Sequence, residues 1–176
     1  MGMTMDRSIA AFDTVLGTCA VRWSDHGITG VGLPSARTPA RPRIETQTGV
    51  PGFVRDAVAA MTAVLDGEPL DLRDVPLDER GIDPWRRQVY AATRAIGPGS
   101  TATYGAIARA IGAPEAARDV GTALSRNPFP IVVPCHRVVA ANGALTGFSA
   151  PGGLETKRRM LELEGAAGYG QGRLFG

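Results

Sequence analysis

The chain has 176 residues with 19 basic and 17 acidic side chains and a formal net charge of +2, an ordinary composition for a globular protein with one or two small domains. Its longest apolar runs are too short to span a bilayer and its N-terminus lacks a basic-then-apolar signal peptide, which argues against a membrane protein and favours a cytoplasmic one. Its two cysteines, Cys19 and Cys135, lie far apart without a neighbouring ligand pair, which argues against a disulfide framework and a zinc site.

The first part of the chain predicts a small antiparallel sheet. Residues 9–33 alternate between apolar and polar side chains, and two turn signals, TVLG at 14–17 and DHG at 25–27, divide them into three short strands. Cys19 is most simply a core residue of the second strand. Residues 34–49 are rich in Pro, Arg, Ser and Thr and have no periodicity, which is typical of a loop.

A helix and a linker are expected next. The apolar side chains that recur at helical spacing are Val54, Val58, Met61 and Leu65, and Gly67 ends this helix. The acidic stretch 66–83 contains two prolines and is predicted to be a linker. We therefore expect two domains, 1–80 and 81–176.

The second domain is predicted to be mostly helical. Asp83-Pro84 is a typical helix start, an N-cap residue followed by proline at the first helical position. Two shorter helices follow at 104–111 and 114–125, separated by a turn that contains Gly112. This arrangement is typical of a helix-turn-helix, although the pattern alone is only weakly specific for nucleic acid.

The predicted helix at 114–125 has an unusual surface, because Arg118 stands among small side chains, namely Ala116, Ala117, Gly121 and Ala123. Small residues allow close packing between helices, and they also make a helix slim enough to enter a DNA groove. The charge distribution permits the interpretation as a DNA-binding helix, since residues 91–176 carry 9 basic and 5 acidic side chains, whereas residues 1–90 carry 10 basic and 12 acidic ones. Lys157 is the only lysine, so nearly every cation is an arginine.

The run IVVPCHRVV at 131–139 is predicted to be an apolar strand that places a thiol, an imidazole and a guanidinium side by side. A thiolate is a strong nucleophile whose pKa falls beside cations, and burying His136 and Arg137 without partners would be costly. A buried free cysteine usually packs as a small hydrophobe. From this stretch alone, Cys135 is equally well a core residue or a nucleophile.

A glycine-rich loop at 142–153 leads into a last helix, predicted over 154–164. At helical spacing, one face of that helix presents Leu154, Lys157, Leu161 and Glu164. A carboxylate on an inward, apolar face needs a partner. The candidate partner of Glu164 is His136.

Several motifs, all in the same order, resemble those of the O6-alkylguanine-DNA alkyltransferases, also called methylated-DNA–protein-cysteine methyltransferases. The resemblance is carried by TYGAIA at 103–108, AARDVG at 116–121, NPFP at 127–130, PCHRVV at 134–139, TGF at 146–148 and LELEG at 161–165. It covers residues 85–165, whereas the N-terminal half is similar only in layout. It implies an α/β fold, with a three-stranded antiparallel sheet plus a helix and a mostly helical domain with a helix-turn-helix.

The resemblance implies that Cys135 attacks the alkyl carbon of O6-alkylguanine in one irreversible, single-turnover transfer, without a cofactor or metal; O4-methylthymine is expected as a second substrate. His136 would take the thiol proton through a water molecule, with Glu164 orienting the imidazole. An indirect contact agrees with the predicted strand, in which adjacent side chains point to opposite faces. Asn127 would brace the active-site strand, and Tyr104 would donate to the guanine or to a flanking phosphate.

The partner implied is double-stranded DNA, bound by a monomer through the minor groove with the damaged base flipped out. Arg118 would fill the gap left by that base. The other residues assigned to the DNA surface are Thr103, Ala117 and Gly121, and those assigned to the lesion pocket are Phe148, Ser149 and Val138. Arg137 would form structural salt bridges behind the site.

Two departures from the family pattern bear on these expectations. Relatives commonly have tyrosine where this chain has Phe148, and alanine where it has Asp119, whose carboxylate beside phosphates is expected to weaken DNA binding. Two other functions remain: a module that binds alkylated bases without removing the alkyl group, which a Cys–His–Glu set argues against, and a cysteine hydrolase, for which an oxyanion-hole motif is missing.

Overall fold

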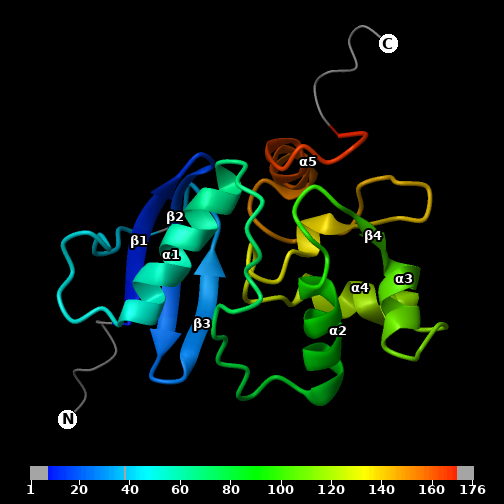
Figure 1. The fold of residues 1–176 in the computed structure, drawn as a ribbon, viewed down its shortest axis with the longest axis horizontal. Helices are drawn as coiled ribbons and strands as arrows, with labels where there is room; N and C mark the ends of the chain where they lie inside the picture. Colours follow the sequence, from blue (N-terminus) through cyan, green and yellow to red (C-terminus); the bar gives the residue numbers. More distant parts are fainter. Residues whose placement is uncertain (1–7, 38, 170–176) are drawn as a thin grey trace, which may run out of the picture.

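The N-terminal part of the computed structural model, which describes residues 8–37 and 39–169, is a three-stranded antiparallel sheet covered on one face by a helix (Figure 1). The strands are β1 (Ile9–Thr14), β2 (Gly17–Ser24) and β3 (Gly27–Gly32), in the order β1-β2-β3, and the helix is α1 (Gly52–Leu65). Cys19 is 1% exposed in the core between them, as predicted. Both turn signals join strands, since Thr14 pairs with Gly17 and Ser24 with Gly27.

The predicted linker at 66–83 packs along the free edge of β3. Ile28 donates its amide to Pro76 O at 2.8 Å, and Asp78 donates its amide to Ile28 O at 2.8 Å. Gly27 is required at this edge, because its φ is +149° and a Cβ atom there would lie 2.8 Å from Pro76 O. These bonds fix the path of the chain between the two halves.

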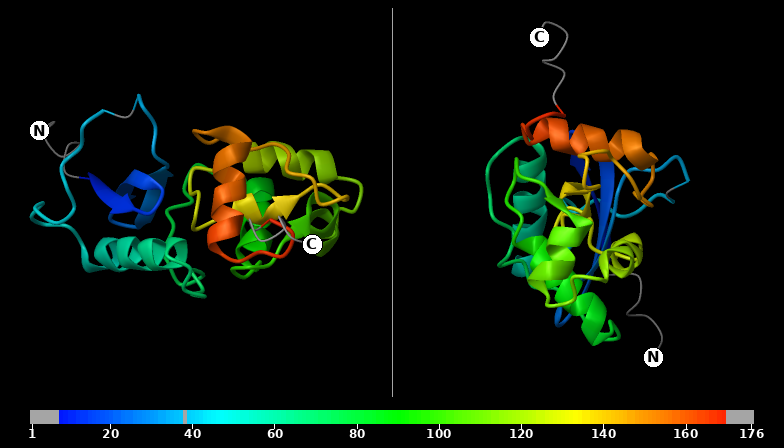
Figure 2. Two further views of the ribbon diagram at one scale, coloured as in Figure 1. Left: turned by 90° about the horizontal axis from the view of Figure 1, so that it is seen from above. Right: turned by 90° about the vertical axis from the view of Figure 1, so that its right-hand side faces the viewer.

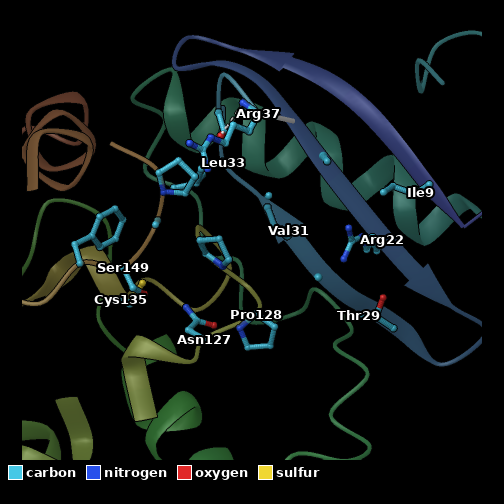
Figure 3. A pocket seen from close by; sticks show the side chains of 18 of the residues that line it. Ile9, Arg22, Thr29, Val31, Leu33, Arg37, Asn127, Pro128, Cys135 and Ser149 are labelled. Atoms are coloured by element: carbon cyan, nitrogen blue, oxygen red, sulfur yellow. Dashed lines mark hydrogen bonds between the residues drawn. The ribbon is translucent and has the colours of Figure 1, made fainter. Parts of the chain in front are cut away.

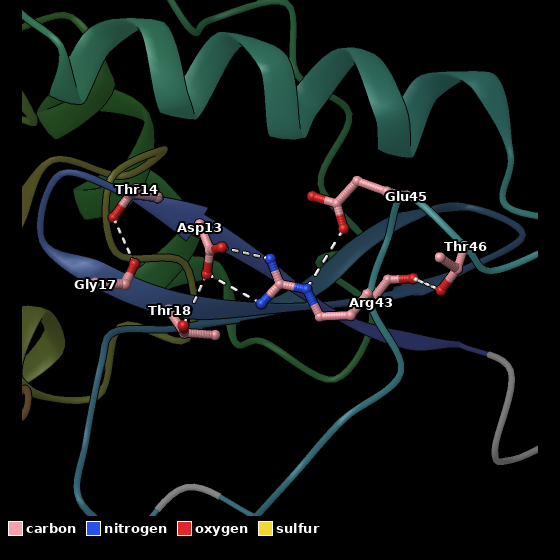
Figure 4. Close-up of polar contacts among 7 residues, drawn as sticks. All are labelled: Asp13, Thr14, Gly17, Thr18, Arg43, Glu45 and Thr46. Carbon is pink, nitrogen blue, oxygen red and sulfur yellow. Dashed lines mark hydrogen bonds and ion pairs between the residues drawn. The ribbon is translucent and has the colours of Figure 1, made fainter.

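Part of the predicted loop at 34–49 is also tied to the sheet, on the β1 side (Figure 4). Ala11 exchanges backbone hydrogen bonds with residues 42 and 44, at 2.8 and 2.9 Å. The Arg43 guanidinium donates to Asp13 at 3.0 Å and lies 3.5 Å from Glu45. These pairs are exposed and stabilise the fold only weakly, so the backbone bonds carry the attachment.

The C-terminal half contains α2 (Pro84–Arg94), α3 (Tyr104–Ala110), α4 (Ala117–Ser125) and α5 (Gly153–Leu163). It also holds the short parallel pair β4 (Ala102–Thr103) and β5 (Val138–Val139) (Figures 1 and 2). Asp83 caps α2 as predicted, accepting the amide of Arg86. α4 starts three residues later than expected, after a turn at 114–115. No helix in the described part of the chain is long and apolar enough to cross a membrane.

The strand predicted over 131–139 was wrong for all but its last two residues. Ile131 has a φ of +75°, which a strand does not tolerate, and Pro134 has no amide to donate to a neighbouring strand. The chain turns instead, and Cys135–Arg137 form a 3-10 helix, η2, that runs directly into β5. Cys135 and His136 therefore diverge by helical geometry, and the argument from opposite faces of a strand does not apply.

Candidate active site

Cys135 lies at the wall of a cavity of about 520 Å³ (Figure 3). Its thiol is only partly exposed, and it opens η2 just after the turn at 131–134. The loop that follows β5 supplies one wall of the cavity, and the open face of the N-terminal sheet supplies the opposite one. The lining residues used below are Asn127, Pro130, Cys135, Gly147, Phe148 and Ser149. A backbone hydrogen bond of 2.9 Å from Val31 to Pro128 O joins the sheet to the segment that precedes Cys135.

The Cys135 thiol is held in its neutral form. Burial raises its pKa above the usual value, while a hydrogen bond from Asn127 and the positive charge of Lys157 act in the opposite direction. A thiol in this state needs a base before it becomes an efficient nucleophile.

His136, Glu164 and Arg137 form a buried network behind the thiol. His136 Nε2 lies 2.8 Å from Glu164 Oε1, and Arg137 donates from Nη2 to the same oxygen at 2.7 Å and from Nε to Oε2 at 3.0 Å. Their side chains are 1%, 1% and 6% exposed. The predicted His136–Glu164 pairing and the salt bridges expected of Arg137 are both confirmed. Arg137 therefore neutralises Glu164 rather than activating the thiol.

The charge states of this network follow from burial and pairing. Burial alone would raise the pKa of Glu164, but hydrogen bonds and charge from His136 and Arg137 lower it to about 2. Burial lowers the pKa of His136, although Glu164 opposes the shift. At neutral pH an ionised carboxylate only accepts hydrogen bonds, so His136 must donate from Nε2 and keep its lone pair on Nδ1.

The lone pair of His136 Nδ1 is the unusual feature of this site. Nδ1 is buried and has no hydrogen-bond partner among the described residues. Buried polar atoms are nearly always satisfied, and an exception often marks a catalytic position or an ordered water. Nδ1 is thus the free hydrogen-bond acceptor that a general base next to Cys135 requires.

Asn127 holds the segment that carries Cys135. Its Nδ2 donates to Val133 O at 2.9 Å, and its Oδ1 accepts the amide of Phe129 at 2.8 Å. Both bonds close the sharp turn around Ile131, so this side chain substitutes for the strand pairing that the segment lacks.

A second hollow, an open groove of about 930 Å³, runs between α3, α4 and the 140–147 segment. All four residues assigned to DNA contact from the sequence line it, together with Tyr104: Thr103, Ala117, Arg118 and Gly121. The hydroxyl of Thr103 is already used, because it caps α3 by accepting the amide of Ala106 at 3.0 Å. Sequence reasoning missed exposed Arg109, the second cation of this groove, whose position in the last turn of α3 was the available signal.

The remaining residues predicted for the site lie in three different places. Phe148 and Ser149 line the Cys135 cavity, and Ser149 Oγ donates to Ser125 O at 2.8 Å. Tyr104 donates from its hydroxyl to Thr146 O at 3.0 Å, at the edge of the groove. The assignment of Val138 to the pocket was wrong, because Val138 is completely buried in β5 and does not line the cavity.

Two expectations about exposed faces also change. Asp119 lines a separate hollow with Asp83 and Arg126, on another side of α4 from the groove that contains Arg118. It occupies the first turn of α4, where a carboxylate stabilises the helix dipole. Leu154, expected on the inward face of the last helix, is 45% exposed.

Comparison with known proteins places this site in a family. Residues 84–166 match the family model of the 6-O-methylguanine DNA methyltransferase DNA-binding domain. The chain is 43% identical over 139 residues to the methylated-DNA–protein-cysteine methyltransferase of Mycobacterium tuberculosis, covering 79% of this chain and 82% of the relative. The relative from Methanothermobacter thermautotrophicus is 36% identical, with 86% and 81% covered.

Solved structures agree over both halves of the chain. Mycobacterium tuberculosis OGT in complex with DNA superposes with a TM-score of 0.70 at 37% identity, covering 89% of this chain and 92% of that one. The O6-methylguanine-DNA methyltransferase from Pyrococcus kodakaraensis superposes with a TM-score of 0.67 at 30% identity, covering 90% and 99%.

Proposed function

Because the chain belongs to the methylated-DNA–protein-cysteine methyltransferase family, we propose that it repairs O6-alkylguanine in DNA by transferring the alkyl group to Cys135. The observation that supports this role for Cys135 is the buried pair of His136 and Glu164 beside its thiol. Cys135 opens on a cavity, and beside it the neutral imidazole of His136 has a buried acceptor on Nδ1. Glu164 fixes that tautomer from the other side of the ring.

The reaction starts with removal of the thiol proton. His136 Nδ1 takes it through one water molecule, and Glu164 stabilises the imidazolium that forms. The sulfur then attacks the alkyl carbon, a C–S bond forms, and the C–O6 bond breaks with its electron pair going to guanine. Guanine takes up one proton, so the net exchange is the thiol hydrogen for the alkyl group.

The product limits the protein to one turnover. The thioether is stable at neutral pH, because a thiolate is a poor leaving group from an alkyl carbon and the described residues of the site offer no nucleophile to displace it. The protein is therefore consumed in a 1:1 ratio with the lesion. O4-methylthymine presents the same alkyl–oxygen bond and is a second substrate in this proposal.

DNA would bind along the groove at α3 and α4, with the minor groove facing Arg118. The alkyl carbon is not open to in-line attack within the base stack, so the nucleotide must be flipped out. Gly147 lines both the groove and the Cys135 cavity, which gives the base a short path between them. Arg118 would fill the vacated stack, and the Tyr104 hydroxyl lies where the base would pass.

The test is to mix the protein with a duplex containing one O6-methylguanine and to measure the intact mass. We expect a gain of one methyl group per molecule, located on Cys135 and absent in Cys135→Ser. Cys19→Ser, which changes the other, fully buried thiol, is the matched control and should still be methylated. A duplex that is bound while Cys135 stays unmodified would instead indicate a lesion-binding module.

A further inference from the structure

Lys157, the only lysine of the chain, is 0% exposed in the middle of α5. Among the described residues no carboxylate lies within ion-pair distance of it. A buried ammonium without a carboxylate is costly, and such groups are usually retained where their charge is used. The alkyl-transfer steps above do not use Lys157.

The contacts of Lys157 all converge on one loop. Its Nζ donates to Thr146 O at 2.8 Å, the same oxygen that accepts the Tyr104 hydroxyl at 3.0 Å. The ammonium also lies 5.8 Å from the centre of the Tyr104 ring and 6.0 Å from that of Phe148, distances at which a cation and a ring attract each other. One buried cation thus joins α3, α5 and the loop.

This loop forms the wall of the reaction cavity. Gly147, Phe148 and Ser149, the next three residues after Thr146, all line the space that contains Cys135. Gly147 has a φ of +59°, and a Cβ atom on it would lie 3.3 Å from the Tyr104 hydroxyl. The hydrogen bonds from Lys157 and Tyr104 to the Thr146 carbonyl therefore fix the position of the cavity wall at 147–149.

Lys157 also acts on the thiol through its charge. It favours the ionised form of Cys135, and Cys135 in turn favours the charged form of Lys157. The other titratable groups near it are Tyr104 of α3 and His136 of η2, and its charge contributes to keeping His136 neutral. Arg137, the remaining cation of η2, is paired with Glu164.

Resting on the proposed alkyl transfer, we propose that Lys157 is a positioning residue for that reaction. Its ammonium fixes the cavity wall at 146–149 through the Thr146 carbonyl and stabilises negative charge on Cys135 as the sulfur attacks.

The reaction to measure is benzyl transfer from the free base O6-benzylguanine, which needs the cavity but no DNA. We expect Lys157→Met, a neutral side chain of similar length, to lower the rate constant at pH 7.5 about tenfold or more, the effect of at least one unit in the thiol pKa. Arg158→Met removes a positive charge from the exposed face of the same helix and should leave the rate within twofold of wild type.

The pH profile separates this role from a merely structural one. Burial lowers the pKa of Lys157 to about 8. With rising pH the wild-type rate should therefore level off near pH 8, as the ammonium loses its proton, while the rate of Lys157→Met continues to rise with thiol ionisation. A Lys157→Met rate within twofold of wild type, or identical profile shapes, would overturn the proposal.

A measurement on the wild-type protein decides the matter if Lys157→Met does not fold. After labelling with ¹³C,¹⁵N-lysine, the protein has a single lysine side-chain signal, and its titration midpoint should lie near 8. A midpoint near 10.4, the value of a solvated lysine, would overturn the proposal that Lys157 is a buried positioning residue. Failure of the proposed function looks different: wild-type Cys135 would gain no benzyl mass, whatever the lysine signal shows.

Discussion

Glu164→Gln is the sharpest test of the buried network, because it changes one atom and removes one charge. The carboxylate accepts from His136 at 2.8 Å and from Arg137 at 2.7 and 3.0 Å, and its side chain is 1% exposed. After substitution Arg137 stays buried, with its bond of 2.7 Å to Ile96 O but no counter-charge. Breaking a buried pair in this way costs about 3–5 kcal/mol.

The pKa of Glu164 gives an independent magnitude. The folded protein lowers it from 4.5 to about 2, and one pKa unit corresponds to 1.36 kcal/mol, so ionised Glu164 contributes about 3 kcal/mol to the free energy of unfolding. Because the folded pKa is the lower one, this contribution is complete above pH 4.5 and is lost as the pH falls towards 2.

The assay is urea denaturation of wild type, Glu164→Gln and the matched control Glu162→Gln, two residues earlier on α5. At pH 7 we expect Glu164→Gln to lower the free energy of unfolding by about 3–5 kcal/mol. In a parallel thermal melt, this loss corresponds to a fall in Tm of roughly 6–20 °C at 2–4 °C per kcal/mol. Glu162→Gln should change stability by less than about 0.5 kcal/mol. The gap to wild type should shrink below pH 4.5, and a Glu164→Gln variant as stable as the control at pH 7 would refute the network.

Three further predictions concern DNA and the loop before Cys135. Arg118→Ala should weaken duplex binding, measured by fluorescence anisotropy, with little change in the slope of log K against log salt, because a side chain inserted in the base stack neutralises no phosphate; an unchanged affinity would place Arg118 outside the interface. Asp119→Asn, outside the groove, should change duplex affinity less than twofold in the same titration, and a clear gain would restore the sequence-based expectation. Asn127→Ala removes the bonds to Val133 and Phe129 and should cost about 1–3 kcal/mol in urea denaturation and slow methyl transfer; a fast and stable variant would contradict its bracing role.

The sequence was sufficient for elements with strong local signals. The three strands are bounded by tight turns, and α2 begins at an Asp-Pro cap, so local chemistry determined both. The inward carboxylate at Glu164 was also predictable, because helical spacing placed it beside buried Leu161 and Lys157.

Local signals failed where long-range contacts decide the backbone. The apolar run at 131–139 has the composition of a strand, but residues 131–134 turn, and the Asn127 side chain holds this turn by donating to Val133 O. The sequence predicted a linker at 76–78. This segment is in fact bonded to Ile28, and nothing in the local sequence indicates a partner so far away in the chain. Val138 was misplaced for a related reason: the two-residue strand that buries it pairs with Ala102.

The two ring nitrogens of His136 have different roles. Nε2 bonds to Glu164, which pairs with Arg137, and Arg137 donates to Ile96 O just after α2, so this nitrogen is part of the buried structural network. Nδ1 bonds to no described residue and is available to accept the proton of the Cys135 thiol. A substitution at Glu164 therefore changes stability and reactivity together.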